Sequence, residues 1–146
     1  MKIEINIDPN LSETRVVIHA PCMTAEIEAL LRRLSAPPPD SITAHTQRGV
    51  ELLPVESVIR IYTERQKVLA QTAQGVYPLR SRLYEMEQRL EGCSFVRISS
   101  SEIVNTKMIT GMDFSLSGTI LITLKGGVTT YVSRRHVAGI KKLFDV

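Results

Sequence analysis

Short apolar stretches separated by turn-forming residues run through most of this chain, and they limit its possible folds more than any other feature. From residue 42 onward each stretch is rich in Val, Ile, Leu or Thr and is followed by glycine or polar residues, which is typical of strands. The expected strands are residues 42–46, 50–53, 58–62, 67–73, 76–79, one beginning at Phe95, 109–114, 118–124 and 128–132. Many short strands joined by tight turns predict an α+β protein that is mostly β.

Only two helices are expected in this part of the chain. Ser81 is the expected N-cap of the first helix, and Gly92 follows its end. The buried face of that helix is expected to hold Leu83, Met86 and Leu90. The second is a short basic helix that follows His136 and ends near Phe144.

The first 40 residues have a different pattern. Residues 2–8 alternate apolar and polar side chains, residues 15–20 read as a second strand, and Thr24 is a plausible N-cap for a helix. The apolar face of that helix is Ile27, Leu30, Leu31 and Leu34. A proline-rich linker, 36–40, should end this helix. The sequence therefore predicts a ββα appendage over residues 1–40 and a second domain over residues 41–146.

Composition indicates a cytoplasmic globular protein. The 146 residues are 43% hydrophobic, and no apolar run approaches the roughly 18 residues of a membrane span. The N-terminus does not resemble a signal peptide, and Cys22 and Cys93 are too few for a disulfide framework. Residues 1–50 carry five basic and six acidic side chains, whereas residues 51–146 carry thirteen and nine. This basic excess favours an acidic partner, with nucleic acid first.

Patterns of catalytic and cofactor chemistry are missing from the sequence. It contains no nucleophile elbow, no phosphate-binding glycine loop and no acid pair spaced for acid–base catalysis. His19 and Cys22 are three residues apart, but no second pair follows that could complete a metal site. We therefore expect no enzymatic activity, no metal, no cofactor and no small-molecule substrate.

Three polar clusters fall where strands end. The first is Arg65, Gln66 and Lys67; the second is Arg97, Ser99, Ser100, Ser101, Asn105 and Lys107; the third is Ser133, Arg134, Arg135 and His136. Such clusters can contact an anionic partner, but serines also simply end strands, and charged strand ends are often only solvated. Arg97 could equally pair with Glu102 or Glu64, and Asn105 is expected to satisfy backbone groups in a turn.

The order and spacing of these segments resemble the LytTR DNA-binding domain. The most specific segment is Phe95-Val-Arg-Ile-Ser-Ser-Ser-Glu-Ile-Val-Asn105, and the hairpin that ends in Tyr131-Val-Ser-Arg-Arg135 supports it. Val58–Glu64 and Gly75–Leu79 also match, so the resemblance runs from about residue 42 to the end. It implies an elongated stack of short antiparallel strands that contacts DNA through loops instead of a recognition helix.

The resemblance also implies a set of DNA-contacting residues. Lys67, Ser100 and Arg135 correspond to the positions that touch bases, although Lys67 and Ser100 depart from the residues that the family commonly has there. The whole expected DNA-binding set is Lys67, Arg97, Ser99, Ser100, Ser101, Lys107, Ser133, Arg134 and Arg135. Of these, Arg97, Ser101, Lys107, Ser133 and Arg134 are expected to hold phosphates, which adds affinity without sequence information.

The expected function is a sequence-specific transcription regulator that binds duplex DNA in its major grooves as a homodimer on repeated half-sites. The first 40 residues are too short for a phospho-receiver, so the chain resembles stand-alone members, in which a small membrane protein is often the controlling partner. The appendage could dimerise, bind that partner, or cover a sheet edge. The alternative function is a non-enzymatic protein-interaction module, such as an anti-activator, that retains the fold.

Overall fold

The computed structural model describes residues 1–35 and 38–146, so Ala36 and Pro37 of the expected linker lie outside the described residues. The helices are α1 Ala25–Ser35, α2 Leu83–Arg89 and α3 Arg134–Phe144. The strands are β1 Ser41–Thr46, β2 Gly49–Pro54, β3 Val58–Glu64, β4 Lys67–Thr72, β5 Gly75–Leu79, β6 Phe95–Ser99, β7 Glu102–Asn105, β8 Ile109–Asp113, β9 Ile120–Leu124 and β10 Thr129–Val132. No helix in the described residues is long and apolar enough to span a bilayer.

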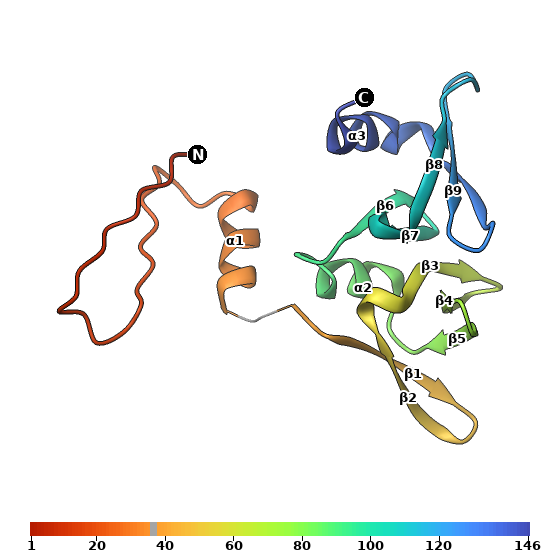
Figure 1. The fold of residues 1–146 in the computed structure, drawn as a ribbon, viewed down its shortest axis with the longest axis horizontal. Coiled ribbons are helices and arrows are strands. Elements are labelled where there is room, and N and C mark those ends of the chain that lie inside the picture. The colour runs from red at the N-terminus through yellow and green to blue at the C-terminus, as the bar shows by residue number, and fades with distance from the viewer. Residues whose placement is uncertain (36–37) are drawn as a thin grey trace.

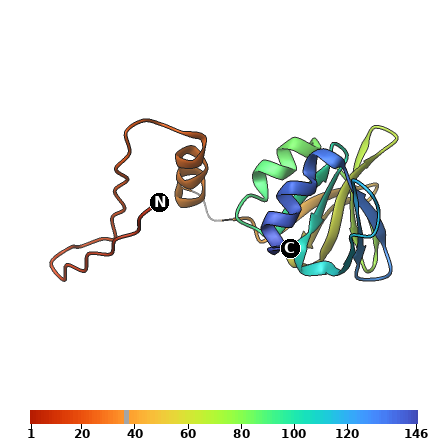
Figure 2. The same ribbon diagram turned by 90° about the horizontal axis from the view of Figure 1, so that it is seen from above.

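The strands form three antiparallel sheets. The central sheet has the order β5-β4-β3-β7-β6, a second sheet has the order β10-β9-β8, and β1 pairs with β2 as a hairpin. In Figure 1 the β1–β2 hairpin lies below the central sheet, and β8 and β9 lie above it. The strands therefore form the elongated stack that the resemblance implied, and the mostly β class is confirmed. Helices α2 and α3 lie on the same side of the strands (Figure 2).

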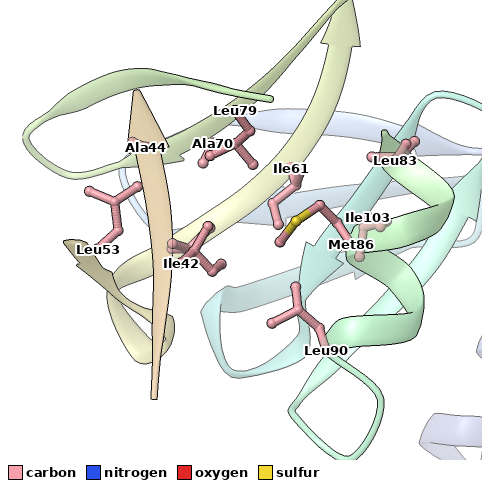
Figure 3. Close-up of a cluster of buried hydrophobic side chains, with 11 residues drawn as sticks. Ile42, Ala44, Leu53, Ile61, Ala70, Leu79, Leu83, Met86, Leu90 and Ile103 are labelled. Atoms are coloured by element: carbon pink, nitrogen blue, oxygen red, sulfur yellow. The ribbon is translucent and has the colours of Figure 1, made fainter. Parts of the chain in front are cut away.

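The central sheet has a hydrophobic core on each face, because successive residues of its strands point to opposite faces and both sets include buried apolar side chains. One core joins the β1–β2 hairpin, the central sheet and α2, where Met86 faces Ile61 and Ile103 (Figure 3). The other joins the central sheet to the three-stranded sheet and α3 through Ile98, Val104 and their neighbours. The adjacent residues Ile103 and Val104 point to opposite faces and enter different cores, so all four residues of β7 are buried.

The prediction of two strands in the first 24 residues is wrong. Residues 2–8 and 15–20 are extended but pair with nothing, and Figure 1 draws them as a long open loop that leads into α1. An isolated two-stranded hairpin is marginally stable, and no apolar surface within residues 1–35 and 38–146 covers these residues. The helix that follows is confirmed: the Thr24 hydroxyl accepts a hydrogen bond from the backbone N–H of Ile27 at 3.3 Å.

Two helix starts also differ from the predictions. Helix α2 is capped at Arg82 and not at Ser81, because the Glu85 carboxylate accepts the backbone N–H of Arg82 at 3.2 Å. Helix α3 starts at Arg134 and not after His136, since Ser133 is already in the extended conformation of an N-cap. The expected final loop is therefore the first turn of a helix.

Candidate nucleic-acid interface

The first polar cluster forms the turn between β3 and β4. Glu64 pairs with Lys67 across the hairpin, so Arg65 and Gln66 are the two central residues of a tight turn. Both have positive φ, 51° and 66°, as the central residues of a type I′ turn do. This backbone conformation is strained for residues other than glycine, asparagine or aspartate. The turn presents Arg65, Gln66 and Lys67 to solvent.

The second cluster forms the turn between β6 and β7. The Ser99 hydroxyl accepts the backbone N–H of Ser101 at 3.2 Å, which closes the turn locally. The guanidinium of Arg97 donates to the carbonyl oxygens of Ser99 and Ser100, at 2.5 and 2.7 Å. Arg97 also reaches Glu87 of α2 at 3.5 Å. Its guanidinium therefore holds the serine turn in one shape.

The third cluster lies where β10 leads into α3. The Ser133 hydroxyl and His136 Nδ1 are 2.7 Å apart. Burial is the main cause that lowers the pKa of His136, and the positive charges of Arg135 and Arg97 lower it further, against an opposing effect of Glu87. The lowered pKa favours the neutral ring, whose Nδ1 can accept a hydrogen bond from the Ser133 hydroxyl. The first turn of α3 carries Arg134 and Arg135, and no side chain caps it, so this helix N-terminus favours an anion.

Backbone hydrogen bonds bring the three clusters together at one end of the strands. The N–H of Thr63, near the end of β3, donates to the Ser101 carbonyl at 2.9 Å. The N–H of Ser133 donates to the Ile98 carbonyl of β6 at 2.8 Å. The serine turn therefore lies between the β3–β4 turn and the start of α3.

Seven exposed side chains of the three clusters have no hydrogen-bond or ion-pair partner among the described residues: Arg65, Gln66, Lys67, Ser100, Lys107, Arg134 and Arg135. Three of the seven, Lys67, Ser100 and Arg135, come from different clusters and are the residues to which the resemblance assigns base contact. By contrast, Arg97, Ser99 and Ser133 are engaged in the internal hydrogen bonds described above, and Ser99 Oγ lies 3.3 Å from Ser101 Oγ.

Two residues of the expected set lie differently. The Arg134 guanidinium covers Gly118 in the loop between β8 and β9, where a Cβ at Gly118 would be 3.2 Å from Arg134 Nε. Lys107 is exposed but follows β7, whose other end adjoins the serine turn. The structure therefore does not bring Lys107 together with the other polar residues.

Sequence reasoning missed the Arg60–Glu102 ion pair, which lies beneath the polar clusters. Arg60 of β3 donates to Gln71 at 2.7 Å, stacks 4.1 Å from the centre of the Tyr62 ring, and lies 3.4 Å from the nearly buried Glu102. The pairing of Arg97 with Glu102 or Glu64, considered above as an alternative, does not form. The missed signal was Arg60 at mid-strand, a position where a charged side chain needs a partner.

Asn105 has the structural role that its position predicted. Its side chain is 1% exposed, its Nδ2 donates to the Val58 carbonyl at 2.9 Å, and its Oδ1 accepts the Lys107 N–H at 3.1 Å. It thereby ties the end of β7 to the start of β3 and shapes the turn that follows.

Residues 48–145 match the family model described as the LytTr DNA-binding domain. The chain belongs to the LytTr DNA-binding domain family. Among solved structures, a LytTr DNA-binding domain from Bacillus cereus aligns with a TM-score of 0.70 at 23% identity, covering 74% of this chain and 99% of that one. This structural likeness supports the same fold.

Curated relatives extend the similarity over the whole chain. An uncharacterized HTH-type transcriptional regulator from Staphylococcus aureus strain NCTC 8325 / PS 47 is 32% identical, covering 100% of this chain and 99% of its own. The counterpart from the bovine strain RF122 / ET3-1 is 31% identical with the same coverage. In the described part of this chain no two α-helices follow one another directly, so the LytTr fold here contains no helix–turn–helix.

Proposed function

We propose that this chain is a transcription regulator that binds duplex DNA sequence-specifically and reads the major grooves with residues of turns and of one helix start. The observation that supports this most is that Lys67, Ser100 and Arg135 are exposed and unpaired, and that backbone hydrogen bonds join the region of the serine turn to the end of β3 and to the start of α3. Membership of a DNA-binding family and the names of the S. aureus relatives support the same reading.

The proposed roles follow from side-chain chemistry. Arg135 can donate two parallel hydrogen bonds to guanine O6 and N7, which discriminates against a wrong base by roughly 1–3 kcal/mol. Lys67 can reach the same acceptors as a point charge, and Ser100 can donate to or accept from a base edge or a phosphate. We assign phosphate contact to Ser99, Ser101, Ser133, Arg97 and Arg134, and also to Lys107, which would have to reach the DNA from outside this group because it follows the other end of β7. Arg97 acts in addition by holding the serine turn.

Two copies on repeated half-sites would double this contact surface. One domain presents three base-reading side chains, which is few for the affinity of a specific regulator. Binding of a second copy to a neighbouring half-site makes the contacts additive and fixes the spacing of the half-sites.

The test replaces Arg135 by alanine and measures both affinity and preference. We expect the purified protein to select a recurrent sequence from a pool of random duplexes, and Arg135→Ala to lower its preference for that sequence over scrambled DNA by about tenfold or more. Arg48→Ala is the matched control, because Arg48 is exposed in the β1–β2 turn, outside the three polar clusters. It should leave the preference unchanged.

The salt dependence separates specific reading from general attraction. Phosphate contacts should make affinity fall steeply with salt for every sequence, while the preference ratio persists at physiological salt. If binding ignores sequence and disappears with salt, or if Arg135→Ala keeps the full preference, the base-reading assignment is wrong. The protein-interaction module, acting without DNA, would then be the better description.

A further inference from the structure

Residues 1–35 expose more apolar side chains than a free surface normally carries. The side chains of Ile3, Ile5 and Ile7 are 80%, 82% and 83% exposed, and Val16 and Val17 are also largely exposed. Contiguous exposed apolar surface of this kind marks an interaction site in soluble proteins. Figure 1 shows the segment extending away from the sheets, so no other part of the described chain covers it.

The three isoleucines form one continuous stripe. In an extended chain, residues two apart point to the same side at a spacing of about 6.5 Å. Lys2 and Glu4 lie on the other side and pair with each other at 3.0 Å. Residues 2–7 are thus apolar on one side and polar on the other, as in a strand that covers an apolar surface.

An apolar groove lies nearby, between the second extended segment and α1. It has a volume of about 440 Å³ and is lined by Val16, Ile18, Met23, Ile27 and Leu31, with Cys22 among them. The isoleucine stripe of the same chain does not fill it, since those side chains remain more than three-quarters exposed. The chain therefore carries both an apolar ridge and an apolar groove, and neither has a partner.

The charges of this segment favour a second copy of the chain as that partner. Helix α1 has Glu26 and Glu28 in its first turn and Arg32 and Arg33 in its last turn. Two such helices related by a two-fold axis perpendicular to them run antiparallel, which sets the acidic end of each beside the basic end of the other. Arg33 forms no ion pair among the described residues, while Arg32 lies 3.2 Å from Glu91 of its own chain. With four basic and five acidic side chains, residues 1–35 have no net attraction for DNA.

We propose that residues 1–35 form a two-fold interface with a second copy of this chain, in which the Ile3–Ile7 stripe of each copy lies in the Val16–Leu31 groove of the other. The interface assigns a surface to the homodimer proposed above. It does not depend on DNA contact, because all DNA-contacting residues proposed here lie in residues 67–135.

Sedimentation of the full chain over about 1–100 µM tests the interface, a range that detects micromolar dimers. We expect a dimer, and we expect Ile5→Asp to raise its dissociation constant at least about tenfold, since an unpaired carboxylate enters each of two apolar grooves. Leu52→Asp is the matched control, because Leu52 is also exposed, at 64%, but lies in β2. The Leu52→Asp variant should dimerise as the wild type does.

Mixed cysteine trapping tests the exchange of stripes between copies. One preparation carries Ile5→Cys, Cys22→Ser and Cys93→Ser, and the other keeps Cys22, which is exposed, and carries only Cys93→Ser. After mild oxidation with diamide, the mixture should give several times more covalent dimer than either preparation alone. A chain with Ile5→Cys, native Cys22 and Cys93→Ser should give the same intermolecular product.

Three results would overturn the proposal. They are a wild type that stays monomeric throughout the range, an Ile5→Asp variant that dimerises normally, and an intramolecular disulfide between positions 5 and 22 in place of an intermolecular one. A monomeric wild type would assign the surface to another protein, such as the small membrane partner that the family resemblance implies. Binding to a single half-site, measured separately, should be unchanged in Ile5→Asp, so a failure here is distinct from a failure to bind DNA.

Discussion

Asn105 is a single buried side chain that satisfies backbone groups of two different segments. Its amide donates to the Val58 carbonyl and accepts the Lys107 N–H, and the residue is only 1% exposed, so both backbone groups lie away from bulk water. Asn105→Ala leaves both backbone groups without a partner, so we expect the free energy of unfolding to fall by about 2–3 kcal/mol. Denaturant unfolding measures this loss.

A conservative change at the same position is the control. Asn105→Ser keeps a hydroxyl that can accept the Lys107 N–H and loses the donor to Val58 without adding a charge, so its loss should be smaller than that of alanine. Equal losses for both variants would mean that the effect comes from burying or removing a side chain and not from the two hydrogen bonds. The sequence predicted this role because a lone amide after two apolar residues needs local partners. The partners of Arg97 were not predictable, because Glu87 meets it only after α2 packs on β6.

At the scale of elements, the strands after residue 40 were predictable, whereas those before it were not. Alternation and turn residues locate nine of the ten strands to within a few residues, since each of these strands has a neighbour to pair with, but they do not reveal β7, whose four residues are all buried and show no alternation. The same alternation over residues 2–8 gives no strand, because the pattern reports a tendency to cover an apolar surface and not the presence of that surface. The β3–β4 turn shows a related gap: its sequence, Arg65-Gln66, lacks the glycine that usually marks a type I′ turn.

The backbone strain of the β3–β4 turn can be tested by substitution. Gln66 has φ 66°, a conformation that glycine adopts without steric cost, so Gln66→Gly should raise the free energy of unfolding by about 0.5 kcal/mol after the greater freedom of the unfolded glycine is subtracted. Gln88→Gly is the control, because Gln88 is an exposed residue of α2 and glycine there should cost about 1 kcal/mol. Thermal unfolding of the two variants should show a higher free energy of unfolding for Gln66→Gly and a lower one for Gln88→Gly. A loss of stability in Gln66→Gly would show that the glutamine side chain stabilises the turn by more than its backbone strain costs.

At the scale of the whole molecule, the proposed interface is divided between two sheets. Lys67 and Ser100 belong to the central sheet, whereas Arg135 follows the last strand of the three-stranded sheet. Their relative positions therefore depend on what joins the sheets, which is the core around Ile98 and Val104 and the nearly buried carboxylate of Glu102. Sequence reasoning found the residues of the three clusters from their order, but only the packed sheets determine their spacing.

Glu102 provides the test of this dependence. It accepts a hydrogen bond from Thr130 of β10 at 2.9 Å and pairs with Arg60 of β3, so one side chain connects both sheets. Glu102→Ala leaves the Arg60 guanidinium without its ionic partner in a largely buried place, and we expect a loss of about 2–3 kcal/mol in the free energy of unfolding. Glu102→Gln keeps an acceptor for Thr130 and should lose less, while Glu51→Ala, exposed on β2, should be neutral.

The DNA measurement on the same variants separates stability from geometry. At a temperature where Glu102→Ala is still folded, specific affinity should fall while weak, non-specific binding persists, because each cluster remains charged but the three no longer keep one spacing. Glu102→Gln, which retains the connection to Thr130, should bind nearly as the wild type does. If folded Glu102→Ala binds its selected site with full affinity, the core alone sets the distance between Ser100 and Arg135, and the carboxylate contributes to stability without positioning the interface.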